Sequence, residues 1–293
     1  MSLKALPFVI LNAFLFGSTL VASRFSVGNF PPLVYLSFRL LIASSAFLLI
    51  YLLRPEAHFP LDGSLWRRVG VFGVFGTALN LVLNVSALQY LSSGVVSVIL
   101  SLSPAMTVLW AHFLLPEERL RGWQWLGLLF AFSGAALLAF SGESGIPDIA
   151  QADPRGYLMV LGAVLANSIM AIYVRKMLKN DNSIQVASIR MFVAALTLIP
   201  LTVFTVQYDP VPVSPIAAGA VIYAGLVGTF GGFFVQLYNI QHFGAVPGSM
   251  VTYLIPIFAG TGGVLLLGEH FTPIMFLGVA IIITGIALVQ RRV

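Results

Sequence analysis

An internal repeat constrains this chain most, because it requires two copies of one fold to share a single molecule. Motifs of the first copy recur about 152 residues later and carry Gly, Pro, Arg and Glu with them. The matched positions are Gly76-Thr77 with Gly228-Thr229, Leu102-Ser103-Pro104 with Leu254-Ile255-Pro256, Glu117 with Glu269, Arg24 with Arg175, Arg39 with Arg190, and Gly127 and Gly134 with Gly278 and Gly285. Self-similarity at one fixed period indicates a duplicated architecture.

The composition is that of a protein solvated by lipid. Of the 293 residues, 59% are hydrophobic and 9% are charged, whereas soluble domains carry roughly 45–50% apolar and about 25% charged residues. Ten apolar runs each approach the ~20 residues that cross a bilayer as a helix. They are residues 5–23, 32–53, 68–88, 93–115, 122–140, 156–177, 184–206, 215–240, 246–267 and 272–290. The sequence therefore predicts an all-α integral membrane protein with ten transmembrane helices.

Lysine and arginine are distributed unevenly between the two sides of this predicted domain. The loops on the side of both termini hold eleven of them, and the opposite side holds two, Arg24 and Arg155. The eleven are Lys4, Arg54, Arg67, Arg68, Arg119, Arg121, Arg175, Lys176, Lys179, Arg291 and Arg292. Because short cytoplasmic loops are rich in basic residues, we expect both termini in the cytoplasm and the protein in the plasma membrane, which in bacteria is the inner membrane.

The repeat and the orientation together predict an inverted architecture. Each copy holds five helices, and because five is odd, the second copy begins on the opposite side of the membrane. We expect a first repeat at 1–140, an extracytoplasmic linker at 141–155 that is a solvated connection, and a second, inverted repeat at 156–293. Inverted repeats are typical of secondary transporters, whose substrate site lies between the repeats near the bilayer midplane.

Several short motifs resemble a known family. Phe16-Gly17-Ser18, Pro31-Pro32 and Phe38-Arg39 look like the opening of the EamA-type ten-helix members of the drug/metabolite transporter superfamily. The resemblance implies an inverted pair of five-helix repeats and export of amino acids or other small metabolites.

Residues 87–134 are also similar to the last three helices of small multidrug-resistance transporters. The similarity includes the spacing of Gly127 and Gly134, and it implies that the fifth helix packs beside the tenth. Those transporters carry a carboxylate inside an earlier helix, whereas all ten acidic residues here fall in loops or at helix ends. His112 is the one histidine well inside a predicted span, and we expect solute movement without coupling to a buried carboxylate.

Polar and aromatic side chains inside the predicted helices are candidates for lining a substrate cavity. An amide that faces hydrocarbon without a partner costs roughly several kcal/mol, so we expect these side chains to point into the protein. The candidates are Asn12, Ser18, Thr77, Asn80, Asn84, Ser97, Ser101, Trp110, Asn167, Gln236, Asn239 and Tyr253. The alternative is packing, in which hydroxyl and amide groups join neighbouring helices.

Two prolines and two arginines occupy corresponding positions in the copies. Pro104 and Pro256 lie near the middle of predicted helices, where proline removes a backbone donor and bends the helix, so we expect hinges there. Arg39 and Arg190 lie inside predicted helices, where a central arginine costs ~2.5–3.5 kcal/mol on insertion scales. We expect a structural or gating role for both, with direct substrate contact as the alternative.

Other functional classes find little support in the sequence. With no cysteine, no intramembrane carboxylate and no clustered histidines, we expect no metal site, no cofactor and no enzymatic activity. A membrane receptor would leave the inverted duplication unexplained. We therefore predict a monomeric secondary transporter in the lipid bilayer, with a small-molecule substrate and no nucleic-acid partner. Amino-acid export is the first expectation, and transport of drugs or other metabolites (a nucleoside, sugar or vitamin) is the alternative.

Overall fold

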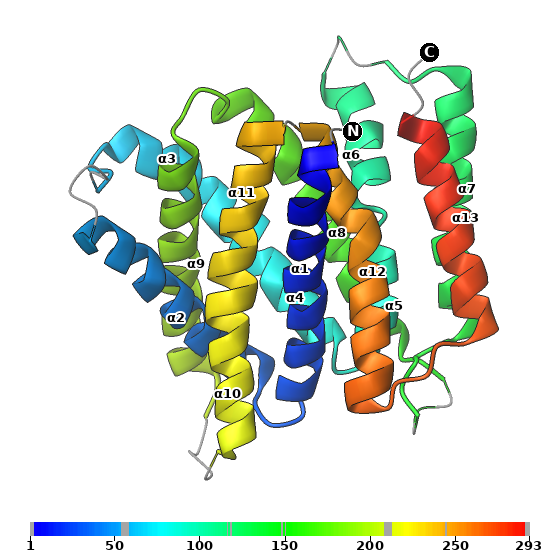
Figure 1. Cartoon of the computed structure of the whole chain (residues 1–293), viewed down its shortest axis with the longest axis horizontal. Coiled ribbons are helices and arrows are strands. Elements are labelled where there is room, and N and C mark those ends of the chain that lie inside the picture. The colour runs from blue at the N-terminus through cyan, green and yellow to red at the C-terminus, as the bar shows by residue number, and fades with distance from the viewer. Residues whose placement is uncertain are drawn as a thin grey trace.

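The computed structural model of this chain describes residues 3–53, 59–115, 117, 119–147, 149, 151–207, 213–243 and 245–290. In this part of the chain every regular element is a helix, and ten helical segments are long and apolar enough to cross a membrane (Figure 1). The prediction of ten transmembrane helices is confirmed. The third span begins at Gly63 rather than at 68, because the side chain of Asp62 accepts a hydrogen bond from the backbone N–H of Ser64 and caps the helix there.

Seven spans are single helices and three are divided. The single helices are α1 (Leu6–Ser26), α2 (Pro32–Leu53), α7 (Gly122–Ser141), α8 (Pro154–Met177), α9 (Ser183–Thr205), α12 (Ala245–Leu267) and α13 (Pro273–Gln290). The divided spans are α3 (Gly63–Val71), the π-helix η2 (Phe72–Ala78) and α4 (Leu79–Ala87); α5 (Ser93–Leu100) and α6 (Ser103–Leu114); and α10 (Pro215–Tyr223), the π-helix η3 (Ala224–Gly231) and α11 (Gly232–Phe243). Large apolar side chains such as Phe140 and Phe204 are exposed on the outside, as in lipid-facing helices.

The helices pack according to a pseudo-two-fold relation between the repeats. α2 packs along α9 and α7 along α13, so that each of these helices contacts its own counterpart. α1 packs on α12 as α8 packs on α5 and α6, and α2 contacts η3 as α9 contacts η2. The start of α1 and the end of α13 lie on the same side of the molecule (Figure 1). We call this side the terminal face and the opposite side the distal face.

The two π-helices lie at the same place in the two repeats. η2 begins at Phe72 and η3 at Ala224, so the two begin 152 residues apart. Each packs tightly on the helix that carries the other repeat's arginine. A Cβ added to Gly73 would lie 3.2 Å from the carbonyl oxygen of Arg190, and a Cβ added to Gly225 would lie 3.1 Å from that of Arg39. A π-turn contains one extra residue and is frequent at functional sites.

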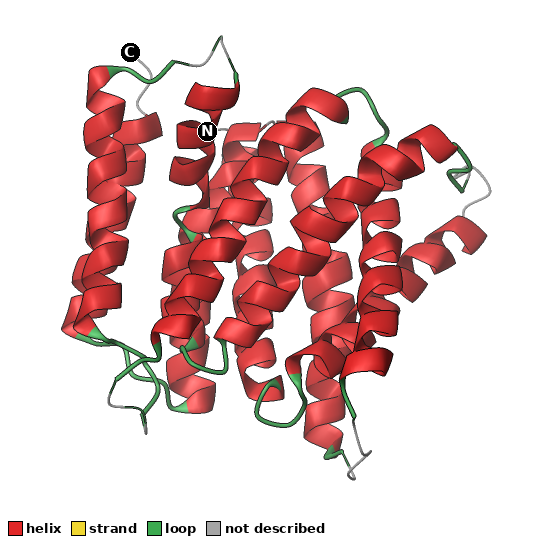
Figure 2. Cartoon of the chain, turned by 180° about the vertical axis from the view of Figure 1, so that it is seen from behind, coloured by secondary structure: helices red, strands yellow, loops and turns green. Residues whose placement is uncertain are grey.

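α7 and α13 form a closely packed pair at one edge of the molecule (Figures 1 and 2). A Cβ added to Gly127 would lie 2.7 Å from the carbonyl oxygen of Gly285, and one added to Gly134 would lie 2.8 Å from that of Gly278. Since real Cβ atoms essentially never approach this closely, only glycine permits the contact. The predicted packing of the fifth helix beside the tenth is confirmed.

The fourth and ninth spans differ although they correspond. The fourth is interrupted at Ser101 and Leu102, and Pro104 stands in the first turn of α6, where proline has no helical donor to lose. α12 instead continues through Pro256, which deprives the carbonyl group of Thr252 of its usual partner. The two repeats therefore adopt different conformations.

The segment between α7 and α8 is bound to the protein at the distal face. Ser144 is buried, and its carbonyl group accepts a hydrogen bond of 2.8 Å from the backbone N–H of Ser92. The carbonyl group of Gly145 accepts one of 2.9 Å from His270. Gly145 has φ +71°, a conformation that favours glycine. The expectation of a solvated connection is thus wrong for this part of the linker.

Candidate gating and substrate site

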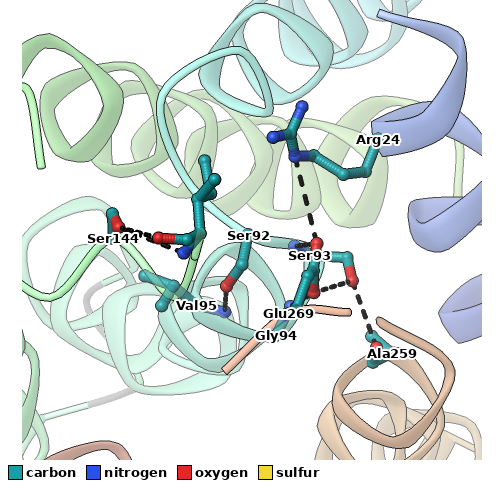
Figure 3. A network of polar contacts seen from close by, with 9 residues as sticks. Arg24, Ser92, Ser93, Gly94, Val95, Ser144, Ala259 and Glu269 are labelled. Atoms are coloured by element: carbon teal, nitrogen blue, oxygen red, sulfur yellow. Dashed lines mark hydrogen bonds and ion pairs between the residues drawn. The ribbon is translucent and has the colours of Figure 1, made fainter. Parts of the chain in front are cut away.

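A buried carboxylate joins three chain segments at the distal face (Figure 3). Glu269 follows α12 and is 4% exposed. Its Oε1 accepts a hydrogen bond of 2.8 Å from the backbone N–H of Ser93, and its Oε2 lies 2.7 Å from the Ser93 hydroxyl and 3.4 Å from the N–H of Gly94. The Nε of Arg24, in the last turn of α1, lies 3.9 Å from Oε1. The carboxylate thus caps the N-terminus of α5, where unpaired N–H groups favour an anion.

We call this set of contacts of Glu269 with Ser93, Gly94 and Arg24 the carboxylate clamp, and a glycine in α12 leaves room for it. A Cβ on Gly263 would overlap Oε2 of Glu269 and lie 2.6 Å from the Ser93 hydroxyl oxygen. That hydroxyl also lies 3.1 Å from the carbonyl oxygen of Ala259 in α12. The distal ends of α1, α5 and α12 are therefore held together by Glu269, which requires a glycine one turn before the end of α12.

The counterpart of Glu269 in the first repeat is not engaged in this way. Glu117 lies between α6 and α7 at the terminal face and is exposed. Within the described part of the chain, no ion pair joins Glu117 to a basic residue. The carboxylate clamp is thus present at the distal face, and the described residues do not form it at the terminal face.

Arg39, two turns into α2 from the distal face, is hydrogen-bonded to two side chains inside the protein. Its Nε donates to Oγ1 of Thr229 at 2.6 Å, and its Nη1 donates to the hydroxyl of Ser23 at 3.2 Å. The Thr229 hydroxyl in turn donates to the carbonyl oxygen of Ala224 at 2.9 Å, across the π-turn. The hydroxyl of Tyr35 lies 2.8 Å from that of Ser23. These bonds connect α1, α2 and η3 in the distal half of the molecule.

Arg190, the counterpart of Arg39 in α9, has no such partners. Its guanidinium carbon lies 3.9 Å from the ring centre of Phe233 and 5.1 Å from that of Phe72. Its Nε is buried without a hydrogen-bond partner among the described residues, and so is Oγ1 of Thr77, the counterpart of Thr229. Cation–π contacts contribute about 0.5–2 kcal/mol, whereas burying an ion costs on the order of several kcal/mol. The rings alone therefore do not compensate the charge of Arg190.

The amides of Asn12 and Asn80 join helices at corresponding places. Nδ2 of Asn80 donates to the carbonyl oxygen of Ala163 in α8 at 2.8 Å. In the amide orientation that satisfies its neighbours, Asn12 donates to the carbonyl oxygen of Gly232 at 3.0 Å and accepts from the backbone N–H of Gln236 at 3.3 Å. Ala163 corresponds to Asn12, and Gly232 to Asn80. The contact of α1 with α11 therefore has its asparagine on α1, whereas the equivalent contact of α8 with α4 has its asparagine on α4, the counterpart of α11.

Three further polar candidates also contact other parts of the protein. Asn84 donates to Oδ1 of Asn80 at 2.9 Å. Asn239 donates to the carbonyl oxygen of Phe8 at 3.1 Å, and the Ser18 hydroxyl lies 2.8 Å from that of Tyr223. Oδ1 of Asn84 and Oδ1 of Asn239 are buried without a partner among the described residues. Asn239 and Ser18 thus join neighbouring helices, Asn84 bonds within α4, and two amide oxygens remain unsatisfied.

The other candidates lie in varied surroundings. Ser97 and Ser101 donate to carbonyl groups three residues earlier in the chain, at 2.6 and 2.5 Å. The Tyr253 hydroxyl is bonded to Nε2 of Gln290. Nε1 of Trp110 is buried and unpartnered in the described structure, and Asn167 is exposed on α8. The structure thus brings together Asn12 with Gln236 and Asn80 with Asn84, and it places the others apart.

Two further features bear on the site. Pro256 lines an apolar groove of about 510 Å³ between α12 and α13, with Phe271 and Phe276 among its walls. His112 lies in the last turn of α6, and its Nδ1 accepts a hydrogen bond of 3.0 Å from the backbone N–H of Leu120, which gives it a structural contact. In the part of the chain that the structure describes, no three His, Cys, Asp or Glu residues are grouped as metal ligands.

Sequence reasoning did not find Glu269 or the two π-helices. The repeat did pair Glu269 with Glu117, but its burial depends on α5 beginning beside it. The π-turns fall where glycines recur in both copies, at 73 and 76 and at 225 and 228. That recurrence was the one available signal.

Two inverted five-helix repeats and paired arginines between them define this chain as a multi-pass α-helical membrane protein of the transporter type. The model of the EamA-like transporter family matches residues 3–140 and again 154–291, so the chain belongs to this family. The name of the family is that of transporters and not of enzymes, and so are the names of two relatives described below, an uncharacterized transporter and a probable amino-acid exporter.

Individual relatives extend over most of the chain. An uncharacterized transporter of Archaeoglobus fulgidus is 25% identical over 94% of this chain and 95% of its own length. A probable terminal-alkyne amino-acid exporter of Streptantibioticus cattleyicolor is 26% identical over 69% of this chain and 66% of its own length. An S-adenosylmethionine/S-adenosylhomocysteine transporter of Chlamydia muridarum is 25% identical over 98% of this chain and 92% of its own length. A crystal structure that covers 99% of both chains at 20% identity matches with a TM-score of 0.68, which shows the shared fold.

Proposed function

We propose that this protein exports amino acids by alternating access between its two repeats. The family supports transport of small metabolites in general. Two relatives carry names that mention an amino-acid exporter and an S-adenosylmethionine transporter. S-adenosylmethionine itself contains an α-amino acid group, so both names support a substrate with that chemistry.

The observation that carries the alternating-access mechanism is the inequality of the two faces. At the distal face, Glu269 clamps α5 to α1 and Arg39 is bonded to Thr229. At the terminal face, Glu117 is exposed and the described residues leave Arg190 and Thr77 unpaired. Two repeats of one design in different states are what alternating access requires. We infer a state that is closed at the distal face, with Arg39 as a gating residue.

The direction of export follows from a proposed orientation. We place the termini in the cytoplasm of a bacterial inner membrane, because basic residues concentrate on the terminal face. Residues 1–140 and 156–293 then form the moving repeats, connected outside the cell by 141–155. A state closed at the distal face is the one in which an exporter accepts its solute from the cytoplasm. Pro104 and Pro256 are the proposed hinges, since the helix is interrupted beside one and continuous through the other.

The test is counterflow into proteoliposomes that contain the purified protein. Radiolabelled amino acids of aliphatic, aromatic and basic types are compared with a nucleoside and a sugar, and protein-free liposomes serve as the control. We expect at least one class of amino acid to exchange, and without an imposed gradient its level should only equilibrate. Exchange of the nucleoside or the sugar alone would contradict amino-acid export.

A pH step across the same liposomes tests the expectation that no buried carboxylate drives transport. The final solute level should be unchanged by a step of either sign, in the wild type and in His112→Ala alike, because His112 is engaged with Leu120. Accumulation of solute several-fold above equilibrium would contradict the facilitator mechanism and leave exchange itself intact.

A further inference from the structure

The surroundings of Arg190 and Arg39 are equivalent in the backbone and different in the side chains. Gly73 packs on the carbonyl group of Arg190 at 3.2 Å, measured from its added Cβ, and Gly225 packs on that of Arg39 at 3.1 Å. Thr77 stands four residues after Gly73, as Thr229 stands four residues after Gly225. The two pairs of helices thus lie at similar distances, so the backbones permit an arginine–threonine bond at both interfaces between the repeats.

Of the two threonines, only Thr229 is hydrogen-bonded to the arginine of the facing helix. Thr229 accepts from Nε of Arg39 at 2.6 Å. At the equivalent interface, the guanidinium carbon of Arg190 lies 3.9 Å from the ring centre of Phe233, so that side chain reaches across from α9 to α11. Two buried polar atoms, Nε of Arg190 and Oγ1 of Thr77, remain without partners among the described residues. Buried polar groups are nearly always hydrogen-bonded, so each of these atoms requires an explanation.

The charge of Arg190 also lacks a counter-ion among the residues that the structure describes. The ion pairs within the described residues join Arg24 to Glu269, Arg68 to Asp181 and Arg155 to Asp153, and none includes Arg190. Phe72 and Phe233 flank the guanidinium and shield part of it from water. A partly shielded guanidinium whose Nε is unpaired is suited to a carboxylate, which a guanidinium binds with two parallel hydrogen bonds.

We propose that Arg190 and Thr77 form the subsite for the carboxylate group of the transported solute. The carboxylate oxygens accept hydrogen bonds from Nε and a terminal nitrogen of Arg190, and the Thr77 hydroxyl donates a third. The rings of Phe72 and Phe233 border the carbon atoms next to the carboxylate. One ligand group thereby satisfies both unpaired atoms and the uncompensated charge. This inference rests on the proposed function and specifies the group by which the solute is recognised.

The site lies two turns into α9 from the terminal face, where α9 begins. A solute that enters from that face meets Arg190 while the distal clamp is closed. An anionic lipid headgroup offers similar chemistry, but a phosphate at this depth would have to leave the membrane surface. We therefore assign the site to a soluble carboxylate, and the experiment separates it from lipid.

The experiment measures binding to the full-length protein in detergent by isothermal calorimetry, without requiring transport. The probes are L-phenylalanine and L-leucine, each compared with its carboxamide and its decarboxylated amine. We expect the acids to bind about tenfold or more tightly than either analogue, since hydrogen bonds to a charged group are lost. Arg190→Gln should remove this preference, Arg190→Lys should retain part of it, and Thr77→Val should weaken acid binding about three- to tenfold.

The matched control is Thr197→Val. Thr197 lies in α9, the helix that carries Arg190, and its hydroxyl donates a hydrogen bond to the carbonyl oxygen of Val193. The affinities of this variant should equal those of the wild type. Equal binding of acids and amides, or an unchanged acid preference in Arg190→Lys and Thr77→Val, overturns the proposal even where Arg190→Gln fails to fold. Binding that appears only when anionic lipid is added, without any dependence on the amino acid, also overturns it. A wild type that binds acids through Arg190 but exchanges no amino acid would contradict the proposed function and leave this subsite standing.

Discussion

We propose that a few single side chains hold the distal face of this molecule closed. Glu269 is held by the two first N–H groups of α5, by a hydroxyl and by Arg24. Each of these donors comes from a segment that must move if the distal face opens. Arg39 adds a second lock on the same side through Thr229 and Ser23. The closed face therefore depends on a few charge-assisted bonds, which can be broken individually by substitution.

Glu269→Gln should destabilise the described state more than Glu117→Gln. The amide keeps the shape of Glu269 but replaces one acceptor oxygen by a donor that faces the donors of α5, and a hydrogen bond to a charged group contributes about 1.5–3 kcal/mol. Glu117 is exposed, so its substitution removes no buried bond. Thermal unfolding of both variants in the same detergent measures this difference. A melting temperature lowered equally by both changes would show that the clamp does not stabilise the distal face.

Among the helices, close packing through glycine distinguishes the α7–α13 pair from the rest of the bundle. α7 and α13 contact each other along their length at one edge of the bundle. The helices that carry the polar contacts, from α1 to α6 and from α8 to α12, lie together beside this pair. The π-helices η2 and η3 are within that group, each against the helix of an arginine. Because α7 belongs to the first repeat and α13 to the second, this pair joins the two repeats at one edge of the bundle.

Leucine at Gly134 or Gly285 should disrupt the α7–α13 pair. A Cβ at Gly285 would lie 2.5 Å from the carbonyl oxygen of Gly127, and backbone atoms cannot move aside as a flexible side chain can. Overpacking of this kind costs about 1–3 kcal/mol or more. The control is Gly122→Leu, because an added Cβ there meets nothing within 4 Å. Melting temperatures should fall for the first two variants, and three equal values would exclude the contact.

The sequence was sufficient to predict the ten spans, because hydropathy is a local signal, and the resemblance to small multidrug-resistance transporters implied the α7–α13 contact at Gly127 and Gly134. It was not sufficient for the partners of Arg39 and Arg190. These residues occupy matching positions in the repeat, and their different environments arise from the conformation of the whole protein. The burial of Glu269 was likewise outside its reach, since a carboxylate in a loop is ordinarily exposed and only the arrival of α5 encloses it.

For the protein as a whole, the pseudo-two-fold relation suggests what the opposite state contains. Exchange of the two conformations between the repeats would pair Arg190 with Thr77 as Arg39 now pairs with Thr229. A carboxylate bound at Arg190 would then lose one of its donors as the terminal face closes. Release of the solute toward the distal face would follow from the same bond that closes the gate behind it.

Cysteine labelling on intact cells tests the orientation on which this sequence of events depends. The chain contains no cysteine, and Gln151 and Asn180 are exposed on the distal and terminal sides of α8. An impermeant thiol reagent should label Gln151→Cys and spare Asn180→Cys until the cells are opened. Gly145 is unsuitable for this purpose, because a Cβ there would clash with Ser92. Labelling in the reverse order would place the termini outside and turn the proposed exporter around.

The paired π-turns also record a history. An extra residue that stands at the same place in both halves, at Phe72–Ala78 and Ala224–Gly231, is most simply inherited from a single ancestor. That ancestor had five helices and carried the widened turn before its gene was doubled. A single five-helix unit cannot supply both halves of this interface, so an unfused unit would need a second copy of opposite orientation, related to it by a two-fold axis. Once the two halves are fused, their sequences can diverge independently. The asparagine of the equivalent helix contacts accordingly lies on α1 in one case (Asn12) and on α4 in the other (Asn80).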